Sequence, residues 1–275
     1  MLPTVEIPES VGEAVGTLAD GDVVLAGGTE LMPRVTTRAT GVSRLVSLRH
    51  AGLAGIEVKG GRADVGAATT LVQLGRDERL AVLRPVVESI ASPTIRNLAT
   101  VGGNLFVRQP YGDLAVALLA LDAEVRVAAG AGNASRPVAA VLDDGVAPRE
   151  LVTAVAFGVP EPGTWFYTKA MRRRQNSASI VTVAAVVLVE DGQVASARIA
   201  LGGAGARPVR AVSAEAALTG HPFDRRHVEE AASAAVEDAS PFDDAYASAW
   251  YRRRVLPVHV RRALLRESDR PEESR

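Results

Sequence analysis

The chain has 275 residues, of which 47% are hydrophobic and 23% are charged, and its formal net charge is −1 at pH 7. Such a chain can bury one large core or two to three small ones, while the near-zero charge and an aromatic content of only 4% argue against nucleic-acid binding. Because it contains no cysteine, it offers no disulfide, iron–sulfur ligand or thiol nucleophile, and its four histidines lack metal-ligand spacing.

The N-terminal stretch MLPTVEIPES has neither the basic region nor the apolar region of a secretory signal. No apolar run approaches the length that crosses a bilayer. We therefore expect a cytoplasmic protein with no integral membrane segment. The sequence assigns no catalytic residue and no metal ligand.

The first fifty residues predict a small unit built around a glycine-rich turn. Ser10 and Glu13 have the spacing of a capping box, and Gly21 stands where a glycine ends a helix. The predicted elements are a helix from Ser10 to about Ala19, a strand Asp22–Leu25, a helix from Thr29 to about Arg38 and a strand Arg44–Leu48.

Gly27 and Gly28 join the first of these strands to the second helix. Free backbone N–H groups at the start of a helix are suited to binding phosphate. The segment matches neither the GxGxxG pattern nor a phosphate-binding loop with its lysine. A tight strand-to-helix turn explains the same residues, and this segment alone favours that interpretation.

A β-hairpin and further helices are predicted next. Residues Ile56–Ala68 form two alternating runs around Gly60 and Gly61, which is a strong hairpin signal. The predicted helices run from Thr70 towards Arg79 and from Leu83 to Ala91, where Pro93 ends them.

The stretch TIRNLATVGGNLFVRQPYGD, residues 94–113, carries a second double glycine, Gly102 and Gly103. A glycine pair lets the backbone approach a ligand closely or adopt a positive φ. Thr100 and Asn104 offer short polar side chains on either side of it. The chain thus has two glycine-rich loops that could hold one ligand.

Asp113 precedes the apolar run LAVALLAL, where capping a helix is the ordinary role of an aspartate. Strands and a loop follow this run. The predicted elements are a strand Glu124–Ala129, a loop Gly130–Ser135 and a strand Glu150–Phe157. The sequence PEPG at Pro160–Gly163 is the best domain boundary.

The remaining residues predict an α+β unit. Asp191 and Gly192 form a hairpin turn between alternating strands, which implies an antiparallel meander of three or more strands. The amphipathic helices expected there are Ala211–Leu218, Arg226–Asp238 and Ala245–Leu265.

With these segments placed, the chain resembles the FAD-binding subunit of the molybdenum hydroxylases, the family of xanthine dehydrogenases and aerobic carbon monoxide dehydrogenases. The matching pieces follow the order and spacing of that family and cover nearly the whole chain. They are LAGGTEL (25–31), TIRNLATVGGNL (94–105), PYGD (110–113) followed by a helix ending in ALDA, FYTKAMRRRQNSASI (166–180) and LGGAGARPVRA (201–211).

The resemblance implies an α+β chain with a PCMH-type FAD-binding domain, residues 1–162, made of subdomains at about 1–53 and 54–162. A smaller C-terminal α+β domain of the carbon monoxide dehydrogenase flavoprotein type, residues 163–275, is expected to hold an antiparallel three-stranded sheet and helices.

The resemblance also implies where FAD binds. The first glycine segment would take the pyrophosphate through backbone N–H groups, and the second would take the rest of the diphosphate and the ribityl chain. The implied contacts are Leu25, Ala26, Gly27, Gly28, Thr29, Glu30, Leu31, Thr100, Gly102, Gly103, Asn104, Val107, Asp113 and Lys169.

Two of these residues carry charge and an alternative role. Asp113 matches a carboxylate that bonds FAD hydroxyls, and it could cap the helix as well. Lys169 matches a lysine near the flavin, where a cation would stabilise the reduced anion and raise its potential. A lysine paired with a surface carboxylate explains Lys169 equally well.

The chain also departs from the family pattern. Arg108 and Gln109 stand where many relatives have a small residue and a serine, so the contacts of residues 107–109 stay open. The run Arg172–Arg174 faces either a partner subunit or solvent.

The function that the resemblance implies is electron transfer by an FAD-binding oxidoreductase subunit. A molybdopterin-binding large subunit would oxidise substrate, a small subunit with two [2Fe–2S] clusters would carry electrons, and this chain would pass them to NAD+, a quinone or oxygen. A dimer of heterotrimers is expected. The alternatives are an independent flavin oxidoreductase and a flavin-less scaffold subunit.

Overall fold

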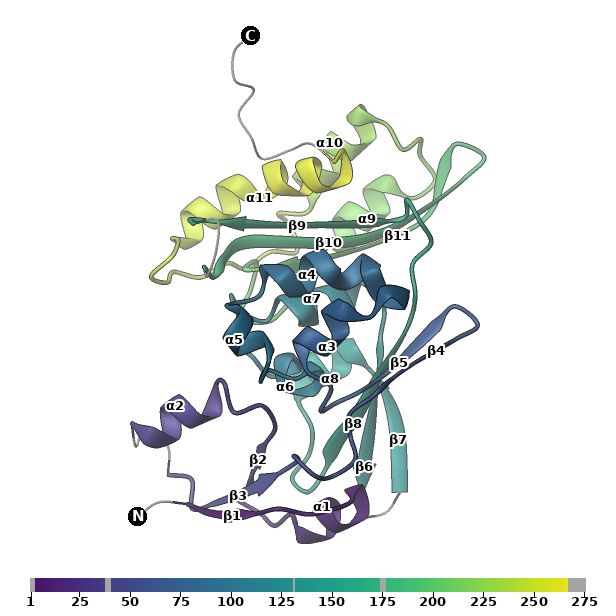
Figure 1. Cartoon of the computed structure of the whole chain (residues 1–275). Coiled ribbons are helices and arrows are strands. Elements are labelled where there is room, and N and C mark those ends of the chain that lie inside the picture. Colours follow the sequence, from purple (N-terminus) through teal and green to yellow (C-terminus); the bar gives the residue numbers. More distant parts are fainter. Residues whose placement is uncertain (1–2, 38–40, 131, 174–176, 267–275) are drawn as a thin grey trace. The chain divides into compact units, whose positions relative to one another are not determined.

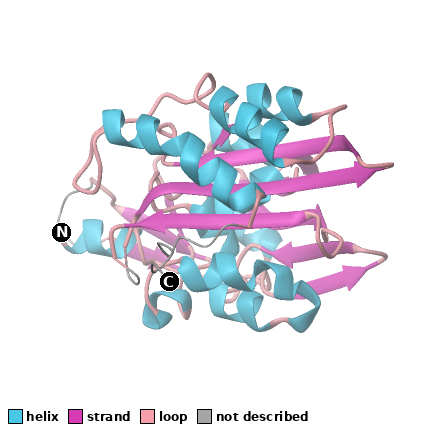
Figure 2. Cartoon of the chain, turned by 90° about the horizontal axis from the view of Figure 1, so that it is seen from above, coloured by secondary structure: helices cyan, strands magenta, loops and turns pink. Residues whose placement is uncertain are grey.

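The computed structural model describes residues 3–37, 41–130, 132–173 and 177–266. The chain forms two units, one made of Met1–Val107 with Asp122–Val159 and the other of Arg108–Leu121 with Pro160–Arg275. Both units combine helices and strands, as the labels of Figure 1 and the colours of Figure 2 show. The predicted α+β class is confirmed.

The first unit begins with a parallel sheet in the order β1-β3-β2. Its elements are β1 (Thr4–Glu6), α1 (Val11–Thr17), β2 (Val23–Leu25), α2 (Leu31–Thr36) and β3 (Arg44–Ser47). The Ser10 hydroxyl caps α1 by accepting the N–H of Glu13 at 3.1 Å, as the sequence predicts. The predicted helices and strands of this part are confirmed, each somewhat shorter than expected.

A second, antiparallel sheet of this unit has the order β4-β5-β8-β6-β7. Its strands are β4 (Ile56–Lys59), β5 (Arg62–Gly66), β6 (Glu124–Ala129), β7 (Gly132–Pro137) and β8 (Leu151–Gly158). The predicted β4–β5 hairpin is confirmed, because Gly60 and Gly61 take φ values of +55° and +73° in the turn.

The prediction of a loop over Gly130–Ser135 is wrong, because β7 covers residues 132–137. Its sequence GNASRP is polar and mostly exposed, so it lacks the apolar alternation that signals a strand. Pairing with β6 along its whole length makes it a strand at the sheet edge.

Short helices complete the first unit. They are α3 (Leu71–Arg76), the 3-10 helix η1 (Glu78–Leu83), α4 (Arg84–Ser89), α5 (Pro93–Arg96), α6 (Val101–Leu105) and α8 (Val138–Asp144). Two predictions are corrected here. Pro93 starts α5 in addition to ending the helical segment before it, because proline fits the first turn of a helix. The second double glycine lies inside α6 and not in an open loop.

The second unit is built on an antiparallel sheet in the order β12-β11-β10-β9. Its strands are β9 (Trp165–Met171), β10 (Ser179–Glu190), β11 (Gln193–Gly202) and β12 (Val209–Arg210). The predicted meander and its turn at Asp191 and Gly192 are confirmed, and the two-residue β12 adds a fourth strand to the expected three.

Helices cover both faces of this sheet. They are α7 (Asp113–Ala120), α9 (Val212–Leu218), α10 (Arg225–Ala234) and α11 (Ala249–Leu264). Val181 and Val183 of β10 lie in the core with α9, α10 and α11, while α7 packs on the opposite face (Figure 1). Because neighbouring strand residues point to opposite faces, Thr182 points towards α7.

The segment Arg108–Leu121, which contains α7, packs with the second unit although residues on both sides of it in sequence belong to the first. The predicted boundary between residues 162 and 163 stays a prediction. Of the arginine run at 172–174, Arg172 donates to the Ala245 carbonyl at 3.3 Å, and Arg174 lies outside the described residues.

Candidate functional site

The two glycine-rich segments lie against each other in the first unit. A Cβ on Gly27 would overlap the carbonyl of Leu98, two residues before Thr100, so only glycine allows this approach. A Cβ on Gly103 would lie 3.8 Å from the Cβ of Ala26. The structure therefore brings together two segments that are more than seventy residues apart in sequence.

The first segment is a turn between β2 and α2. Leu25 ends β2, Glu30 precedes α2 at its N-cap position, and Leu31 begins the helix. Gly28 has a φ of +71°, a conformation that side chains with a Cβ rarely adopt.

Within the described residues, the backbone N–H groups of Gly27, Gly28 and Thr29 donate no hydrogen bond to another residue. All three residues are half-buried. Backbone amides left without a protein acceptor in a turn form the kind of concave site that binds anions. The first segment thus has free donors for a phosphate.

The second segment presents a different chemistry, because its amides are already bonded. The N–H of Gly102 donates to the Ala67 carbonyl at 2.9 Å, and that of Gly103 donates to Oγ1 of Thr100 at 3.1 Å. The Asn104 side chain is 5% exposed, and its Oδ1 atom is buried without a partner among the described residues. A buried, unpaired acceptor is costly, so Asn104 is the group of this segment that is available to a ligand.

Val107 follows the second segment and is half-buried, with its N–H donated to the Asn104 carbonyl at 3.3 Å. The structure therefore assembles the predicted contacts from Leu25 to Leu31 and from Thr100 to Val107 in the first unit. Asp113 and Lys169 belong to the second unit.

Asp113 and Lys169 form a buried ion pair in the second unit. The Lys169 Nζ donates to Asp113 Oδ2 at 2.8 Å, and the two side chains are 4% and 2% exposed. Thr182 Oγ1 donates to the other carboxylate oxygen at 2.6 Å. Burial raises the pKa of the Asp113 carboxyl, while the Lys169 ammonium and the Thr182 hydroxyl act in the opposite direction.

The geometry contradicts the two alternative roles that the sequence allowed, helix capping by Asp113 and pairing of Lys169 with a surface carboxylate. Gly112 holds the N-cap position of α7, and Asp113, the first residue of the helix, makes no capping bond with its side chain. The partner of Lys169 is a buried carboxylate and not a surface one. The contacts of these two residues with FAD stay predictions.

Sequence reasoning missed two residues beside Asp113. Thr182 lies in an apolar strand, and nothing in its spacing indicates a bond to a residue 69 positions away. Gln109 is 8% exposed, and its amide accepts the N–H of Gly203 at 2.9 Å. The only sequence feature that pointed to Gln109 was its departure from the family pattern.

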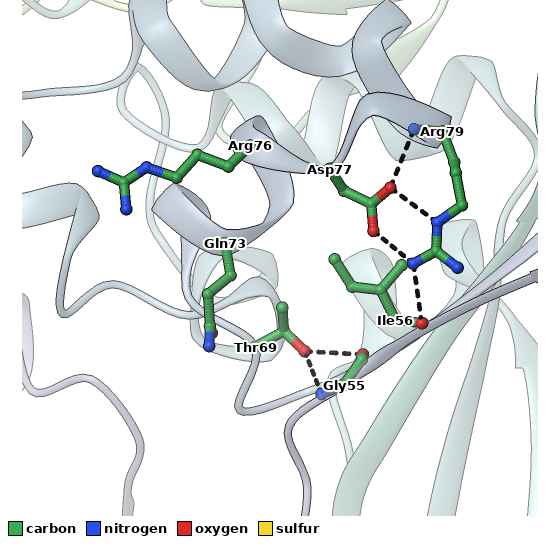
Figure 3. A pocket seen from close by; sticks show the side chains of 7 residues that line it. All are labelled: Gly55, Ile56, Thr69, Gln73, Arg76, Asp77 and Arg79. Carbon is green, nitrogen blue, oxygen red and sulfur yellow. Dashed lines mark hydrogen bonds and ion pairs between the residues drawn. The ribbon is translucent and has the colours of Figure 1, made fainter.

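A pocket of about 390 Å³ lies elsewhere in the first unit, beside α3 and β4 (Figure 3). Its polar groups are largely paired with one another. Arg79 binds Asp77 and the Ile56 carbonyl, and the Thr69 hydroxyl bonds to Gly55. The pocket is lined by Gly55, Ile56, Thr69, Gln73, Arg76, Asp77 and Arg79, none of which is a predicted cofactor contact.

Across the ranges that the structure describes, no helix combines the length and apolar character needed to cross a membrane. The same ranges contain no cluster of three or more His, Cys, Asp or Glu side chains that could hold a metal ion.

Among the described residues, the turn amides of the first segment and the buried oxygen of Asn104 have no protein partner. Amides of this kind can bind an anion such as a phosphate, and an amide oxygen can accept a hydrogen bond from a hydroxyl group. Residues 4–161 match the family model described as "FAD binding domain in molybdopterin dehydrogenase". Residues 166–266 match the "CO dehydrogenase flavoprotein C-terminal domain". The chain belongs to this family of FAD-binding oxidoreductase subunits of the molybdenum hydroxylases, and its cofactor is FAD.

The chain is similar to several named proteins over almost its whole length. It is 30% identical to the carbon monoxide dehydrogenase medium chain of Afipia carboxidovorans, over 96% of both chains. It is 31% identical to subunit alpha of the 6-hydroxypseudooxynicotine dehydrogenase complex of Paenarthrobacter nicotinovorans, over 94% of this chain and 92% of that one. Among solved structures, carbon monoxide dehydrogenase from Hydrogenophaga pseudoflava matches with a TM-score of 0.91 at 27% identity, over 96% of both chains.

Proposed function

We propose that this chain is the electron-transfer flavoprotein subunit of a molybdopterin-dependent hydroxylase. It would accept electrons from a [2Fe–2S] subunit and pass them to NAD+, a quinone or oxygen. The observation that supports the proposal is that two adjacent segments each offer groups without a partner among the described residues. These groups are the amides of Gly27–Thr29 and the side-chain oxygen of Asn104. Bound FAD supplies the two-electron redox chemistry, and the protein supplies position and electrostatics.

Each group of the chain has a distinct part in this proposal. The amides of the first segment hold the diphosphate, because they have no acceptor among the residues that the structure describes. The Oδ1 atom of Asn104 accepts a hydrogen bond from a cofactor hydroxyl. Asp113 bonds a further hydroxyl, and Lys169 holds the Asp113 side chain in place through the buried ion pair at 2.8 Å.

The proposed partners are a molybdopterin-binding large subunit and a small [2Fe–2S] subunit, arranged as a cytoplasmic dimer of heterotrimers. The names of two relatives, "medium chain" and "complex subunit alpha", describe parts of assemblies. This chain has no cysteine with which to bind an iron–sulfur cluster, so the cluster would belong to another chain.

Asn104→Leu tests the cofactor site. The change removes a buried acceptor with no partner in the described part of the chain, so the FAD-free variant should melt at the same temperature as the wild type or higher. Its affinity for FAD should fall by about tenfold, the size of one lost hydrogen bond of ~1.4 kcal/mol. Titration of the chain with FAD, followed by the flavin absorption bands, measures this.

The matched control is Asn97→Leu, the same change at an exposed asparagine of the neighbouring segment. It should leave FAD affinity unchanged. A normal affinity in Asn104→Leu would remove this residue from the site. A wild-type chain that takes up no FAD, either alone or with the subunits encoded beside it, would reject the proposed function.

A further inference from the structure

Gln109 is a buried polar side chain with bonds at both ends of its amide. Its Oε1 accepts the N–H of Gly203 at 2.9 Å, and its Nε2 donates to the carbonyl of Gly112 at 3.4 Å. Gln109 is 8% exposed. It therefore links the end of β11 to the residue immediately before Asp113.

The end of β11 is shaped to admit this amide. A Cβ on Gly202 would stand 2.8 Å from Val116 Cγ2 and 3.0 Å from Gln109 Oε1. Gly203 has a φ of +71°, and a Cβ there would overlap the Ile180 carbonyl. Two glycines thus let the backbone come close enough to donate to Gln109.

The residues between Gln109 and Asp113 are attached to the same sheet. The carbonyl of Pro110 accepts Ser179 Oγ at 2.8 Å and the Ser179 N–H at 3.3 Å. Asp113 itself is held by Lys169 and Thr182. Gln109 and Asp113 are therefore the two side chains that fix this segment at its ends.

The bond to the Gly112 carbonyl bears directly on Asp113. That carbonyl and the N–H of Asp113 belong to one planar peptide group, so fixing the oxygen fixes the plane from which the Asp113 backbone starts. Glycine has no Cβ to restrict rotation on its side of this plane. The N–H of the same peptide donates to the Tyr111 carbonyl at 3.1 Å, so the Gln109 amide adds a further restraint on the plane. Without the Gln109 amide, the plane turns more readily and shifts the carboxylate relative to Lys169 and Thr182.

We propose that Gln109 is the positioning residue of Asp113 for FAD binding. The proposal rests on the proposed function, in which Asp113 bonds a cofactor hydroxyl. Gln109 touches neither the carboxylate nor the cofactor in this scheme; it acts through the Gly112 peptide. Its effect on FAD therefore depends on the presence of the Asp113 carboxylate.

A double-mutant cycle on the full chain tests this dependence. Gln109→Leu removes both amide bonds at similar volume and should weaken FAD binding by about tenfold. Asp113→Asn should weaken it as well, and the double variant should bind FAD no more weakly than Asp113→Asn alone. If the two losses multiply, Gln109 acts on stability in general and the inference is overturned.

Gln109→Glu is a second variant for the case in which the leucine does not fold. It keeps an acceptor for the Gly203 N–H but replaces the donor to the Gly112 carbonyl by an oxygen. It should show the same loss of FAD affinity. The matched control is Gln193→Leu, at an exposed glutamine of the same sheet, which should bind FAD as the wild type does.

Hydrogen exchange of the FAD-free chain gives a readout that does not need the cofactor. Gln109→Leu should raise exchange in the first turn of α7, residues 113–116, more than in α9 or α10. Unchanged exchange in that turn overturns the inference even if FAD binds. A wild-type chain that binds no FAD, with or without its neighbouring subunits, rejects the proposed function and the cofactor role of Gln109 together.

Discussion

Gly102 and Gly103 are adjacent in sequence and face different surroundings. A Cβ on Gly102 would stand 2.8 Å from the Cβ of Ala67 and 3.1 Å from its carbonyl oxygen. A Cβ on Gly103 would meet only Thr100 Oγ1 at 3.0 Å and the Cβ of Ala26 at 3.8 Å. The first glycine is required for packing, and the second borders the candidate site.

We therefore expect Gly102→Ala to destabilise the chain by about 1–3 kcal/mol, the usual cost of overpacking a core. Gly103→Ala should change stability little, because the tight contact with Thr100 is offset by up to ~1 kcal/mol of helix propensity gained in α6. Chemical denaturation of the two FAD-free variants measures the difference. Equal destabilisation by both would contradict the packing argument.

Some features of individual residues can be predicted from the sequence, and others cannot. The turn glycines Gly27 and Gly28 could be predicted, because a double glycine between strand and helix is a local signal. The partner of Asp113 could not, because Lys169 is 56 residues away and the pair forms only when β9 packs near α7. Asn104 Oδ1 has no partner among the residues described, and this too depends on surrounding residues that no local sequence pattern indicates.

Among the elements, β7 is a strand because of its tertiary contacts and not because of its sequence pattern. Its polar sequence contains no strand pattern, and an ion pair with the segment before β8 helps to anchor it. Arg136 of β7 binds both carboxylate oxygens of Glu150, and Glu150 also accepts the Ala147 N–H at 2.8 Å. The hairpins at Gly60 and at Gly192 were predictable by contrast, because their turn residues signal them directly.

The Arg136–Glu150 pair predicts a pH dependence of stability. Hydrogen bonding to Arg136, followed by the Ala147 amide, lowers the pKa of Glu150 below its ordinary value of 4.5. The folded state then binds its proton less readily than the unfolded state, so the contribution is present above pH 4.5 and is lost as pH falls through the lowered pKa.

Glu150→Gln should therefore be less stable than the wild type at neutral pH and should lose less stability on acidification below about pH 4.5. Unfolding curves measured at a series of pH values compare the two slopes. Because Arg136 is 36% exposed, solvent screening keeps the effect modest. Parallel slopes would show that Glu150 has the same pKa in the folded and unfolded states.

At the scale of the whole molecule, the chain passes between its two units at three points, after residues 107, 121 and 159. The last passage, after residue 159, lies next to the Pro160–Gly163 sequence. The other two leave no composition signal, since α7 is a short apolar helix between ordinary loops. Tertiary packing alone assigns α7 to the second unit.

This arrangement predicts how fragments behave. Residues 160–266 alone lack α7, so they leave uncovered the sheet face that contains Thr182 and Ala184, both 0% exposed in the intact chain. A fragment in which residues 108–121 are joined to residue 160 by a flexible glycine–serine linker should unfold cooperatively and at a higher temperature. Calorimetry of the two fragments compares them, and equal transitions would show that α7 is dispensable to the second unit.

The ribosome synthesises α7 before the strands on which this helix packs. All eight residues of this DLAVALLA helix are buried in the finished fold, yet β11, one of the strands it packs on, ends only at Gly202. After Ala120 the ribosome must add 82 residues to reach Gly202, which takes about 4–16 s at ~5–20 residues per second. During that interval the nascent chain carries an apolar segment without its sheet, and we expect a general chaperone to bind that segment.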